Sequence, residues 1–482
     1  MALLQEMVRP VRRETPRAEG VRGLRPRSEP ARLWPQALVL LLLPVALVVA
    51  AALRWDLTLQ IAHGLLWLGF AAAIAWRWGT LRLVRRPEGT VPHATAEGAD
   101  LPRYSIALPL FAEPRLARDC IDRLKKIDYP VDRLDIMILV QDRDEETAEA
   151  VRRLDWACLR MLRVPSGGRA DALNAALSHA WGKYLAVFDP EEAPHPQQLR
   201  EAVKRFQAGP ATLACLQAPV RILRTRRTPA AGAAASGGSG FLEAQLAAEQ
   251  AVLFELTLPA LARLSAPFPL GDASCHFRVE ALREVGGWDA TNIVEESDLG
   301  FRMACRGLHS GLLDRASWRA APAEVRRWLP QRTRWLKGQM QTLAALLSRP
   351  AGLGRAGVLS LVLTLGLGLA SAFVQAPMLA YLVMVALLAA LQGLAPALSP
   401  LDLGLLTAGL VTAALARRQA VRRSGAAYGW TDAVLLPFYG ALTTLAGLHA
   451  AGEVLVAAVT RTPAVPLAAE PETAKTAGRL AA

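Results

Sequence analysis

The chain has 482 residues, of which 52% are hydrophobic and 20% are charged, and its formal net charge is +13. This composition is too apolar for an ordinary soluble enzyme and too charged for a protein made only of membrane spans, so we expect both kinds of part. Nucleic-acid binding is disfavoured, since much of the arginine lies in the N-terminal tail and beside apolar runs, where anionic lipid and membrane topology favour it. The five cysteines are scattered without a Cys-x-x-Cys pair, which indicates reduced thiols facing a cytosol.

Two apolar runs near the N-terminus predict a pair of membrane-spanning helices. Residues 1–32 are rich in Arg and Pro and predict a disordered basic tail. The runs Leu33–Leu53 and Leu57–Trp76 are each long enough to cross a bilayer, which predicts a transmembrane hairpin over residues 33–78. Arginines on both sides of this hairpin place its two ends in the cytoplasm, so the region that follows should be cytoplasmic.

Short apolar runs alternate with amphipathic stretches over residues 100–348. We expect strands at Tyr104–Leu110, Leu134–Val140 and Tyr184–Phe188, and helices at Pro114–Lys126 and Ala170–Ala180. Strands and helices that alternate at this spacing predict a mostly parallel sheet covered on both faces, in a Rossmann-like α/β domain. Ligands of such sheets bind beyond the carboxyl ends of the strands, so polar residues at those ends are the first candidates for a site.

Acidic residues follow two of these strands. Asp142 and Asp144 come after the second predicted strand, and Asp189, Glu191 and Glu192 come after the third. The Asp189-Pro-Glu191 turn resembles a carboxylate pair that holds Mg²⁺ or Mn²⁺ bridged to a diphosphate, because hard cations prefer oxygen ligands. Two acids in a turn are also common on any protein surface, and that alternative stays open at this point.

A second acidic group follows a Gly-Gly turn in the run Val285–Gly300. Its carboxylates Glu295, Glu296 and Asp298 stand just before an apolar helix start. Acids in this position can simply stabilise the N-terminus of the helix. A crowded acidic cluster also tends to raise the pKa of one carboxyl toward the range of a general base. Glu296 or Asp298 is therefore a candidate for deprotonating an acceptor hydroxyl.

A basic, Trp-bearing stretch follows at Gln331-Arg-Thr-Arg-Trp335. A helix that begins at about Pro330 would place Gln331, Arg334 and Trp335 on one face. The amide and indole N–H can hold a sugar or an acceptor hydroxyl, and the guanidinium can neutralise a phosphate. A basic amphipathic helix lying at a membrane surface would show the same composition, and the stretch alone does not decide between the two.

Apolar runs return over residues 354–459. No charged residue occurs between Ala356 and Leu401, which is enough for two spans broken near Pro377. The further runs Leu403–Ala416 and Ala433–Ala451 extend this region, and residues 460–482 predict a disordered tail.

Four arginines between positions 417 and 423 conflict with the simplest count of spans. They should be cytoplasmic, but counting the predicted spans from a cytoplasmic Ser348 puts them on the outer side. We therefore expect five or six spans in all.

Six short motifs follow one another in a fixed order: Leu108–Glu113, Gln141–Asp144, Ala172–Asn174, Asp189–Glu191, the run Gly286–Gly300 and Gln331–Trp335. Together they resemble the membrane-embedded, processive-type family 2 glycosyltransferases, the group that contains bacterial cellulose synthase. The resemblance covers about Tyr104 to Thr342 and the flanking spans.

The resemblance implies a GT-A fold, a nucleotide-diphosphate sugar donor such as a UDP-hexose, a divalent cation and inversion at the anomeric carbon. By position in the motifs, Glu113 belongs to the donor site and Asp142 or Asp144 contacts the uridine. Asp189 and Glu191 hold the cation and the diphosphate. The face formed by Gln331, Arg334 and Trp335 binds diphosphate and caps the acceptor sugar.

Three positions differ from the motifs of that family. Val294-Glu295-Glu296 stands where the family has Thr-Glu-Asp with the Asp as base, so the carboxylate of Glu296 is moved by one methylene. Arg169 and Asp171 replace the usual lysines before Ala-Leu-Asn. Gly271–His276 differs from the common Gly-Gly-Thr-Ser-Asn-His.

We therefore expect a multi-pass protein of the inner, or plasma, membrane with a cytoplasmic catalytic domain. It would transfer sugar to a growing polysaccharide or a lipid-linked acceptor, with polysaccharide export subunits as potential partners. A single-addition transferase that makes a glycolipid is one alternative. The other is a degenerate, inactive subunit of a polysaccharide secretion complex, which the substitution at Glu296 favours and the intact Asp189, Gln331, Arg334 and Trp335 oppose.

Overall fold

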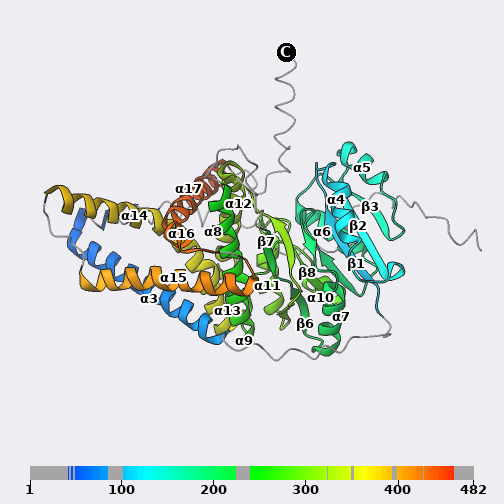
Figure 1. The fold of residues 1–482 in the computed structure, drawn as a ribbon, viewed down its shortest axis with the longest axis horizontal. Coiled ribbons are helices and arrows are strands. Elements are labelled where there is room, and N and C mark those ends of the chain that lie inside the picture. The colour runs from blue at the N-terminus through cyan, green and yellow to red at the C-terminus, as the bar shows by residue number, and fades with distance from the viewer. Residues whose placement is uncertain are drawn as a thin grey trace, which may run out of the picture.

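The computed structural model describes residues 52–84, 101–223, 239–322, 324–348, 352–392, 399–426 and 428–460, with a few positions between 42 and 50. An α/β domain forms one end of the molecule, and long helices extend from it at the other end (Figure 1). The predicted tail over residues 1–32 and most of the first predicted span lie outside the described residues, as does the predicted tail over residues 460–482 except for Thr460, which ends a helix.

A seven-stranded sheet forms the centre of the α/β domain, in the order β3-β2-β1-β4-β8-β6-β9. Strands β1 to β4 are parallel, whereas β8 runs antiparallel to both of its neighbours, β4 and β6. The bounds are β1 Tyr104–Pro109, β2 Leu134–Gln141, β3 Leu159–Val164, β4 Tyr184–Val187, β6 Leu213–Gln217, β8 Cys275–Arg278 and β9 His309–Leu312. The predicted parallel sheet and its three predicted strands are confirmed.

Strand β3 did not stand out in the sequence because two arginines interrupt its apolar pattern. In the structure Arg160 pairs with Asp135 of the neighbouring β2 at 2.5 Å, and Arg163 pairs with Glu145 at 2.8 Å. Both charges are thus neutralised at the edge of the sheet, and the remaining Leu and Val side chains of β3 join the core. Local apolar pattern therefore underestimates a strand whose charges find partners on adjacent elements.

Helices cover both faces of the sheet and bury two separate cores. One core includes Leu173 of α6 and Leu299 of α11, and the other includes Ile121 of α4 and Phe206 of α7. The covering helices are α4 Leu116–Leu124, α5 Glu145–Arg152, α6 Arg169–His179, α7 Gln198–Ala208, α10 Val279–Val285 and α11 Glu295–Ala304, with a 3₁₀ turn at Val131–Arg133. This layering is the α/β arrangement, covered on both faces, that the sequence predicts.

A small second sheet and three helical segments complete the domain. The sheet has the order β5-β10-β7, and its strands are β5 Ala193–Pro194, β10 Ser317–Ala320 and β7 Val220–Leu223. The helical segments are α8 Ser239–Val252, a π-helical turn Leu253–Thr257 and α9 Leu258–Arg263. Neither the small sheet nor the antiparallel β8 was predicted, because their strands are only two to four residues long.

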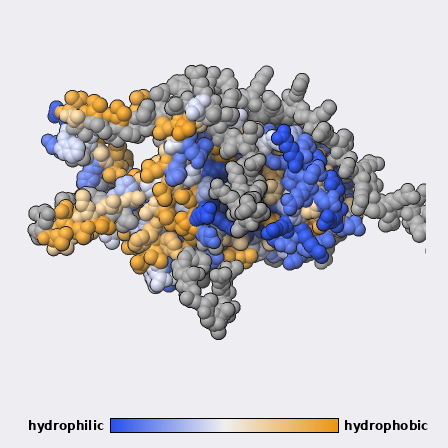
Figure 2. All heavy atoms as spheres, turned by 90° about the horizontal axis from the view of Figure 1, so that it is seen from above, coloured by the Kyte–Doolittle hydropathy of each residue, from blue (hydrophilic) through white to orange (hydrophobic). Residues whose placement is uncertain are grey.

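Four helices of the described residues are long and apolar enough to cross a membrane. Their hydrophobic side chains gather at the end of the molecule away from the sheet, whereas hydrophilic residues cover the α/β domain (Figure 2). The helices are α3 Trp55–Leu83, the continuous helix Gly354–Leu391, α15 Pro400–Ser424 and α17 (Leu436–Thr460, apolar over Leu436–Ala458). The short α16 Trp430–Val434 precedes α17.

The helix Gly354–Leu391 corrects the prediction of two spans broken near Pro377. It consists of α13 Gly354–Leu361, a π-helical turn Val362–Gly366 and α14 Leu367–Gln392, and Pro377 lies inside α14. The hydroxyl of Thr444, on the adjacent α17, accepts a hydrogen bond from the Ala376 N–H at 3.1 Å. Contacts of this kind allow a proline to remain inside a transmembrane helix.

A single helix over this stretch also removes the conflict over the arginines at 417–423. If Gly354–Leu391 and α15 each cross the membrane once, the chain returns to the side of the α/β domain. Arg417 donates to Gln245 Oε1 of α8 at 2.9 Å, and Arg423 donates to the Val84 carbonyl at 2.7 Å. The arginine cluster therefore lies at the end of α15 that contacts α8 and α3, which is compatible with the charge rule.

Helix α12 Val325–Ser348 joins the α/β domain to the membrane helices. The helix begins five residues before the predicted start at Pro330, and this proline therefore lies inside it. The extra turn is held by Trp328, which packs with Leu242 and Tyr439. The proline itself leaves one backbone hydrogen bond of the helix unmade.

Candidate active site

Acidic side chains from four segments gather at one edge of the large sheet. The carboxyl ends of β1, β2 and β4 lie at this edge because these strands are parallel. The antiparallel β8 begins at the same edge, so residues 271–275 join it. The loops that leave the edge carry Glu113, Asp142, Asp189 and Asp272.

Asp189 lies close to three other carboxyls. Its Oδ1 accepts the Glu191 N–H at 3.2 Å, which folds the turn after β4. Burial raises the pKa of Glu113, and the negative charges of Asp189 and Glu191 raise it further. Glu113 from the β1 loop therefore lies near the Asp189-Pro-Glu191 turn.

Glu192 lies beneath this turn and is buried. Its Oε2 accepts hydrogen bonds from the Ser274 hydroxyl at 3.0 Å and from the Asp189 N–H at 3.4 Å. Its Oε1 is buried without a hydrogen-bond partner in the described structure. Burial raises the pKa of Glu192 to about 8, and the charge of Asp189 adds to the shift. Sequence patterns marked Glu192 only as one acid among three.

The donor set around Asp189 fits a divalent cation that is also bound by a diphosphate. Within the described ranges, no three His, Cys, Asp or Glu side chains form a complete metal site. Asp189 and Glu191 could supply carboxylate oxygens, and the ligand would have to supply the other oxygens. The crowded negative charge next to the orphaned oxygen of Glu192 would be offset by such a cation.

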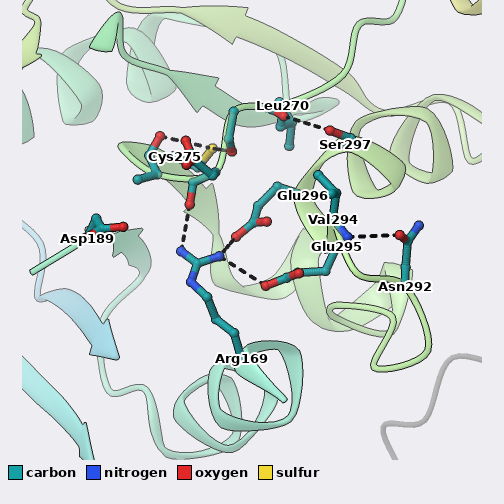
Figure 3. Close-up of polar contacts among 12 residues, drawn as sticks. Arg169, Asp189, Leu270, Cys275, Asn292, Val294, Glu295, Glu296 and Ser297 are labelled. Atoms are coloured by element: carbon teal, nitrogen blue, oxygen red, sulfur yellow. Dashed lines mark hydrogen bonds and ion pairs between the residues drawn. The ribbon is translucent and has the colours of Figure 1, made fainter. Parts of the chain in front are cut away.

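A buried ion-pair group lies beside Asp189, at the start of α11 (Figure 3). Arg169, the first residue of α6, donates from Nη1 to Glu295 Oε1 at 3.1 Å and to Glu296 Oε1. Its Nη2 donates to the Asp272 carbonyl at 2.6 Å. Burial disfavours the charge of Arg169, but Glu296 and Glu295 together hold the pKa of this guanidinium above its usual value.

Glu296 has a pKa that its surroundings shift toward the range of a general base. Burial raises the pKa of its carboxyl to about 8. Arg169 opposes this shift, whereas the negative charges of Glu295 and Asp272 add to it. A carboxylate with such a pKa can accept a proton readily and release it again near pH 7.

Asp298, the other candidate base, is engaged elsewhere. Its Oδ2 accepts a hydrogen bond from Arg302 one turn later in α11, and Arg302 also donates to the Gly287 carbonyl at 2.8 Å. These contacts tie the N-terminus of α11 to the Gly-Gly turn. The geometry favours Glu296 over Asp298 as the base.

Asn174, in the Ala-Leu-Asn motif, fixes α6 relative to the Gly-Gly-Trp turn. Its side chain donates to the Trp288 carbonyl at 2.8 Å and accepts the Trp288 N–H at 2.9 Å. A Cβ at Gly287, whose φ is +71°, would lie 2.2 Å from the Asn174 Oδ1, so a glycine is required there. The motif thus places Arg169 and α11 in a fixed relation.

The two aspartates after β2 differ in their contacts. Asp144 caps α5 by accepting the Thr147 N–H at 3.1 Å, and its other oxygen accepts the Ala112 N–H at 2.6 Å. Ala112 has a φ of +53° and directly precedes Glu113. Asp144 therefore shapes the loop that carries Glu113, which favours Asp142 as the residue that contacts a nucleoside.

The face of α12 that carries Gln331, Arg334 and Trp335 continues into a contact with the α11 start. One turn later on that face, Gly338 packs against Val294, and Thr342 Oγ1 accepts a hydrogen bond from the Asn292 amide at 2.8 Å. Gln331 and Arg334 are exposed and Trp335 is half-buried. Residues three or four apart share a helix face, so these three side chains are directed along the side that meets the Glu295–Glu296 segment.

Arg319 belongs to the site, although no sequence motif marks it. It lies on β10 of the small sheet and donates to Asp272 Oδ2 at 2.9 Å. The charges of Asp272, Glu192 and Asp189 all act on it. Arg319 and Arg169 therefore place two guanidinium groups around the carboxylates. Only contacts between distant segments could have revealed Arg319.

Replacing Gly338 with alanine is expected to destabilise the protein. The new Cβ would lie 2.2 Å from Val294 Cγ2 and 3.0 Å from the Val294 backbone nitrogen, so α12 would have to move from the α11 start. Overpacking of this kind costs about 1–3 kcal/mol. Thermal unfolding in detergent measures the change.

Gly79→Ala is the matched control, because Gly79 is also helical and a Cβ there meets nothing within 4 Å. This control should be neutral or stabilising by up to about 1 kcal/mol. Equal melting temperatures for Gly338→Ala and the wild-type chain would contradict the tight packing at Val294.

The comparison with known families identifies most of the α/β domain. Residues 102–338 match the family described as "Glycosyltransferase like family 2". A probable glycosyltransferase, YdaM, of Bacillus subtilis is 20% identical over 60% of this chain and 67% of its own length. The beta-monoglucosyldiacylglycerol synthase of Synechocystis sp. is 26% identical over 57% of this chain and 56% of its own.

A plant relative and a solved structure extend the comparison. Glucomannan 4-beta-mannosyltransferase 7 of Arabidopsis thaliana is 24% identical over 53% of this chain and 45% of its own length. The chain thus spans about half to two thirds of these three curated relatives. The mannosyltransferase PcManGT from Pyrobaculum calidifontis, solved with GDP-Man and Mn²⁺, has a TM-score of 0.48 and 20% identity, covering 83% of this chain and 97% of its own.

Proposed function

We propose, from the match of residues 102–338 to the family 2 glycosyltransferases, that the chain is a membrane-bound inverting glycosyltransferase. It would move a sugar from a nucleotide-diphosphate donor to an acceptor at the membrane. One observation carries the proposal. Glu296 and Asp189 lie near each other at one edge of the sheet, and the charges of both act on Arg169 (Figure 3).

In the proposed reaction Glu296 removes the proton of an acceptor hydroxyl as its oxygen attacks the anomeric carbon. The bond from that carbon to the diphosphate oxygen breaks, and the nucleoside diphosphate leaves with the bonding electrons. One displacement of this kind inverts the anomeric configuration. Glu296 can take the proton because burial at the start of α11 raises the pKa of its carboxyl. It also lies near the Asp189-Pro-Glu191 turn, which would hold the donor.

The leaving diphosphate gains negative charge, and this chain offers cationic groups to neutralise it. Arg334 is exposed on the α12 face that approaches the α11 start. A divalent cation held by Asp189 and Glu191 would stabilise the same charge when it is bound. Gln331 and Trp335, on the same face as Arg334, are proposed to cap the acceptor sugar.

The donor is proposed to be a UDP-hexose, with Asp142 contacting the uridine. The names of the relatives include a glucosyl-lipid synthase and a mannosyltransferase, so glucose and mannose donors are the first to test. The solved mannosyltransferase binds GDP-Man with Mn²⁺, and guanosine donors therefore belong in the same screen.

The acceptor is proposed to be a growing polysaccharide or a lipid-linked molecule at the cytoplasmic face of the inner membrane. Contacts between α12 and its neighbours fix this helix against the apolar helices. Arg332 pairs with Glu249 of α8 at 2.7 Å, and Lys337 pairs with Glu453 of α17 at 3.0 Å. Leu336 packs with residues of α14 and α17, and Gln331, Arg334 and Trp335 lie on the other face of α12.

A donor screen tests this function. The purified full chain in nanodiscs is incubated with Mg²⁺ or Mn²⁺ and single UDP- or GDP-sugars, with diacylglycerol or oligosaccharide acceptors, and nucleotide release is measured. We expect release with one donor and its loss on chelation of the metal. Nucleotide diphosphate binding without turnover of any donor would contradict transfer and favour an inactive subunit of a secretion complex. Lipid-bound or polymeric product separates the two acceptor classes.

The pH dependence of turnover is expected to report the Glu296 carboxyl. A base with a pKa of about 8 is protonated and inactive below that value, so kcat/KM should rise with pH and level off above about pH 8. Below the midpoint it should fall by about tenfold per pH unit. The charged groups facing this carboxyl are Arg169 of α6, Glu295 of α11 and Asp272 before β8. A flat profile between about pH 6 and 9 would contradict Glu296 as the base.

A further inference from the structure

Arg169 makes three contacts from two different nitrogens of its guanidinium group. Its Nη1 contacts one carboxylate oxygen of Glu295 and one of Glu296, and its Nη2 contacts the Asp272 carbonyl. A guanidinium presents several N–H groups in a planar fork, whereas an ammonium concentrates its charge on one nitrogen. The arginine therefore fixes both glutamates relative to the loop before β8.

The contact to Glu296 uses only one of its two oxygens. Arg169 donates to Oε1, and among the described residues no other hydrogen bond to this carboxylate is found. The side chain of Glu296 is buried, with 3% of its surface exposed. Holding Oε1 thus limits where Oε2 can lie, and Oε2 remains available to accept a proton.

A glutamate needs such a restraint more than an aspartate does. Its carboxylate stands on one more rotatable bond, so the oxygens can occupy more positions. Misplacement of a reacting group by about 1 Å can cost roughly 100-fold in rate. The backbone on both sides is already fixed, because Asn174 of α6 is hydrogen-bonded to Trp288 before α11.

We propose that Arg169 is the positioning residue of the base: it holds Oε1 of Glu296 and so aims Oε2 at the acceptor hydroxyl. The inference rests on the proposed function, since it assigns Arg169 a part in the same reaction. It sets Arg169 apart from Arg334, whose proposed partner is the leaving diphosphate.

A double-mutant cycle with Arg169→Lys and Glu296→Asp tests this role. Each single variant should lose about 100-fold in kcat, because either change misplaces the reacting oxygen. The double variant should be no more than about threefold slower than the slower single variant, because residues that act as one unit are not additive. Arg319→Lys is the matched control. Arg319 contacts Asp272 but neither glutamate, so its effect should simply multiply with that of Glu296→Asp.

A second readout separates positioning from donor binding. Calorimetry with UDP or GDP and Mn²⁺ should give Arg169→Lys an affinity within about threefold of the wild-type value, that is, within less than 1 kcal/mol. Multiplicative losses in the cycle would overturn the inference. So would a weakening of nucleotide binding by about tenfold or more with kcat unchanged, because Arg169 would then be a donor ligand. If the wild-type chain turns over no donor, the proposed function itself fails, which is visible before any variant is made.

Discussion

Glu296→Gln is expected to lower kcat by about 1,000-fold, since positioned acid–base groups contribute about 100- to 10,000-fold. Glutamine has nearly the same shape as glutamate but cannot accept the proton of the acceptor hydroxyl. The hydrogen bond from Arg169 can be kept by the amide oxygen, so the fold and the donor site should survive. Nucleotide release and nucleotide affinity, measured on the same preparation, separate the chemical step from binding.

Asp298→Asn is the control for that experiment. Asp298 lies in the same first turn of α11 and is also buried, but its partner is Arg302. It should lose much less activity than Glu296→Gln, and its effect should appear in the melting temperature. A greater loss of turnover for Asp298→Asn than for Glu296→Gln would assign the base to Asp298.

Asp189→Asn is expected to lower turnover by about 100- to 1,000-fold, the usual cost of removing one group that stabilises transition-state charge. An amide is a weaker ligand than a carboxylate for a hard cation, so the Mn²⁺ or Mg²⁺ concentration for half-maximal rate should also rise. Nucleotide release measured over a metal titration gives both values. The charge next to Glu113 and Glu192 falls at the same time, which should lower the pKa of both carboxyls.

Asp132→Asn controls for the loss of one negative charge. Asp132 is exposed in the 3₁₀ turn before β2, where it pairs with Arg133 at 3.5 Å. It should leave turnover unchanged, because an exposed ion pair contributes little. An unchanged metal requirement in Asp189→Asn would show that Asp189 is not a ligand of the cation.

The sheet could be predicted from sequence where its strands are buried on both faces. β1, β2 and β4 are mostly apolar, and acidic residues follow β2 and β4 directly in the sequence. The antiparallel β8 could not be predicted, because its pairing with β4 joins residues that are about ninety positions apart in the chain. Pro377 inside one long helix was also hidden, since the adjacent Ala376 N–H bonds to Thr444 of the neighbouring helix α17. The π-helical turn was hidden as well, and its Leu365 packs with Phe301 of α11 and Leu346 of α12.

The candidate site shows the same division. Motif order was enough to nominate Glu113, Asp189, Glu191 and Glu296, and the structure brings Glu113 to the Asp189 turn. The roles of Asp298 and Asp144 in helix ends became clear only from their partners, Arg302 and Ala112. Arg319 comes from a four-residue strand in the second sheet, and no local pattern could connect it to Asp272.

The anomeric configuration of the product tests the account most directly. The wild-type chain is supplied with the donor that it turns over and with a soluble acceptor, and the new glycosidic linkage is read by nuclear magnetic resonance before it can be hydrolysed. A single displacement assisted by Glu296 predicts that an α-linked donor gives a β-linked product. An α-linked product would contradict the proposed role of Glu296, because retention requires a second displacement that this arrangement does not provide.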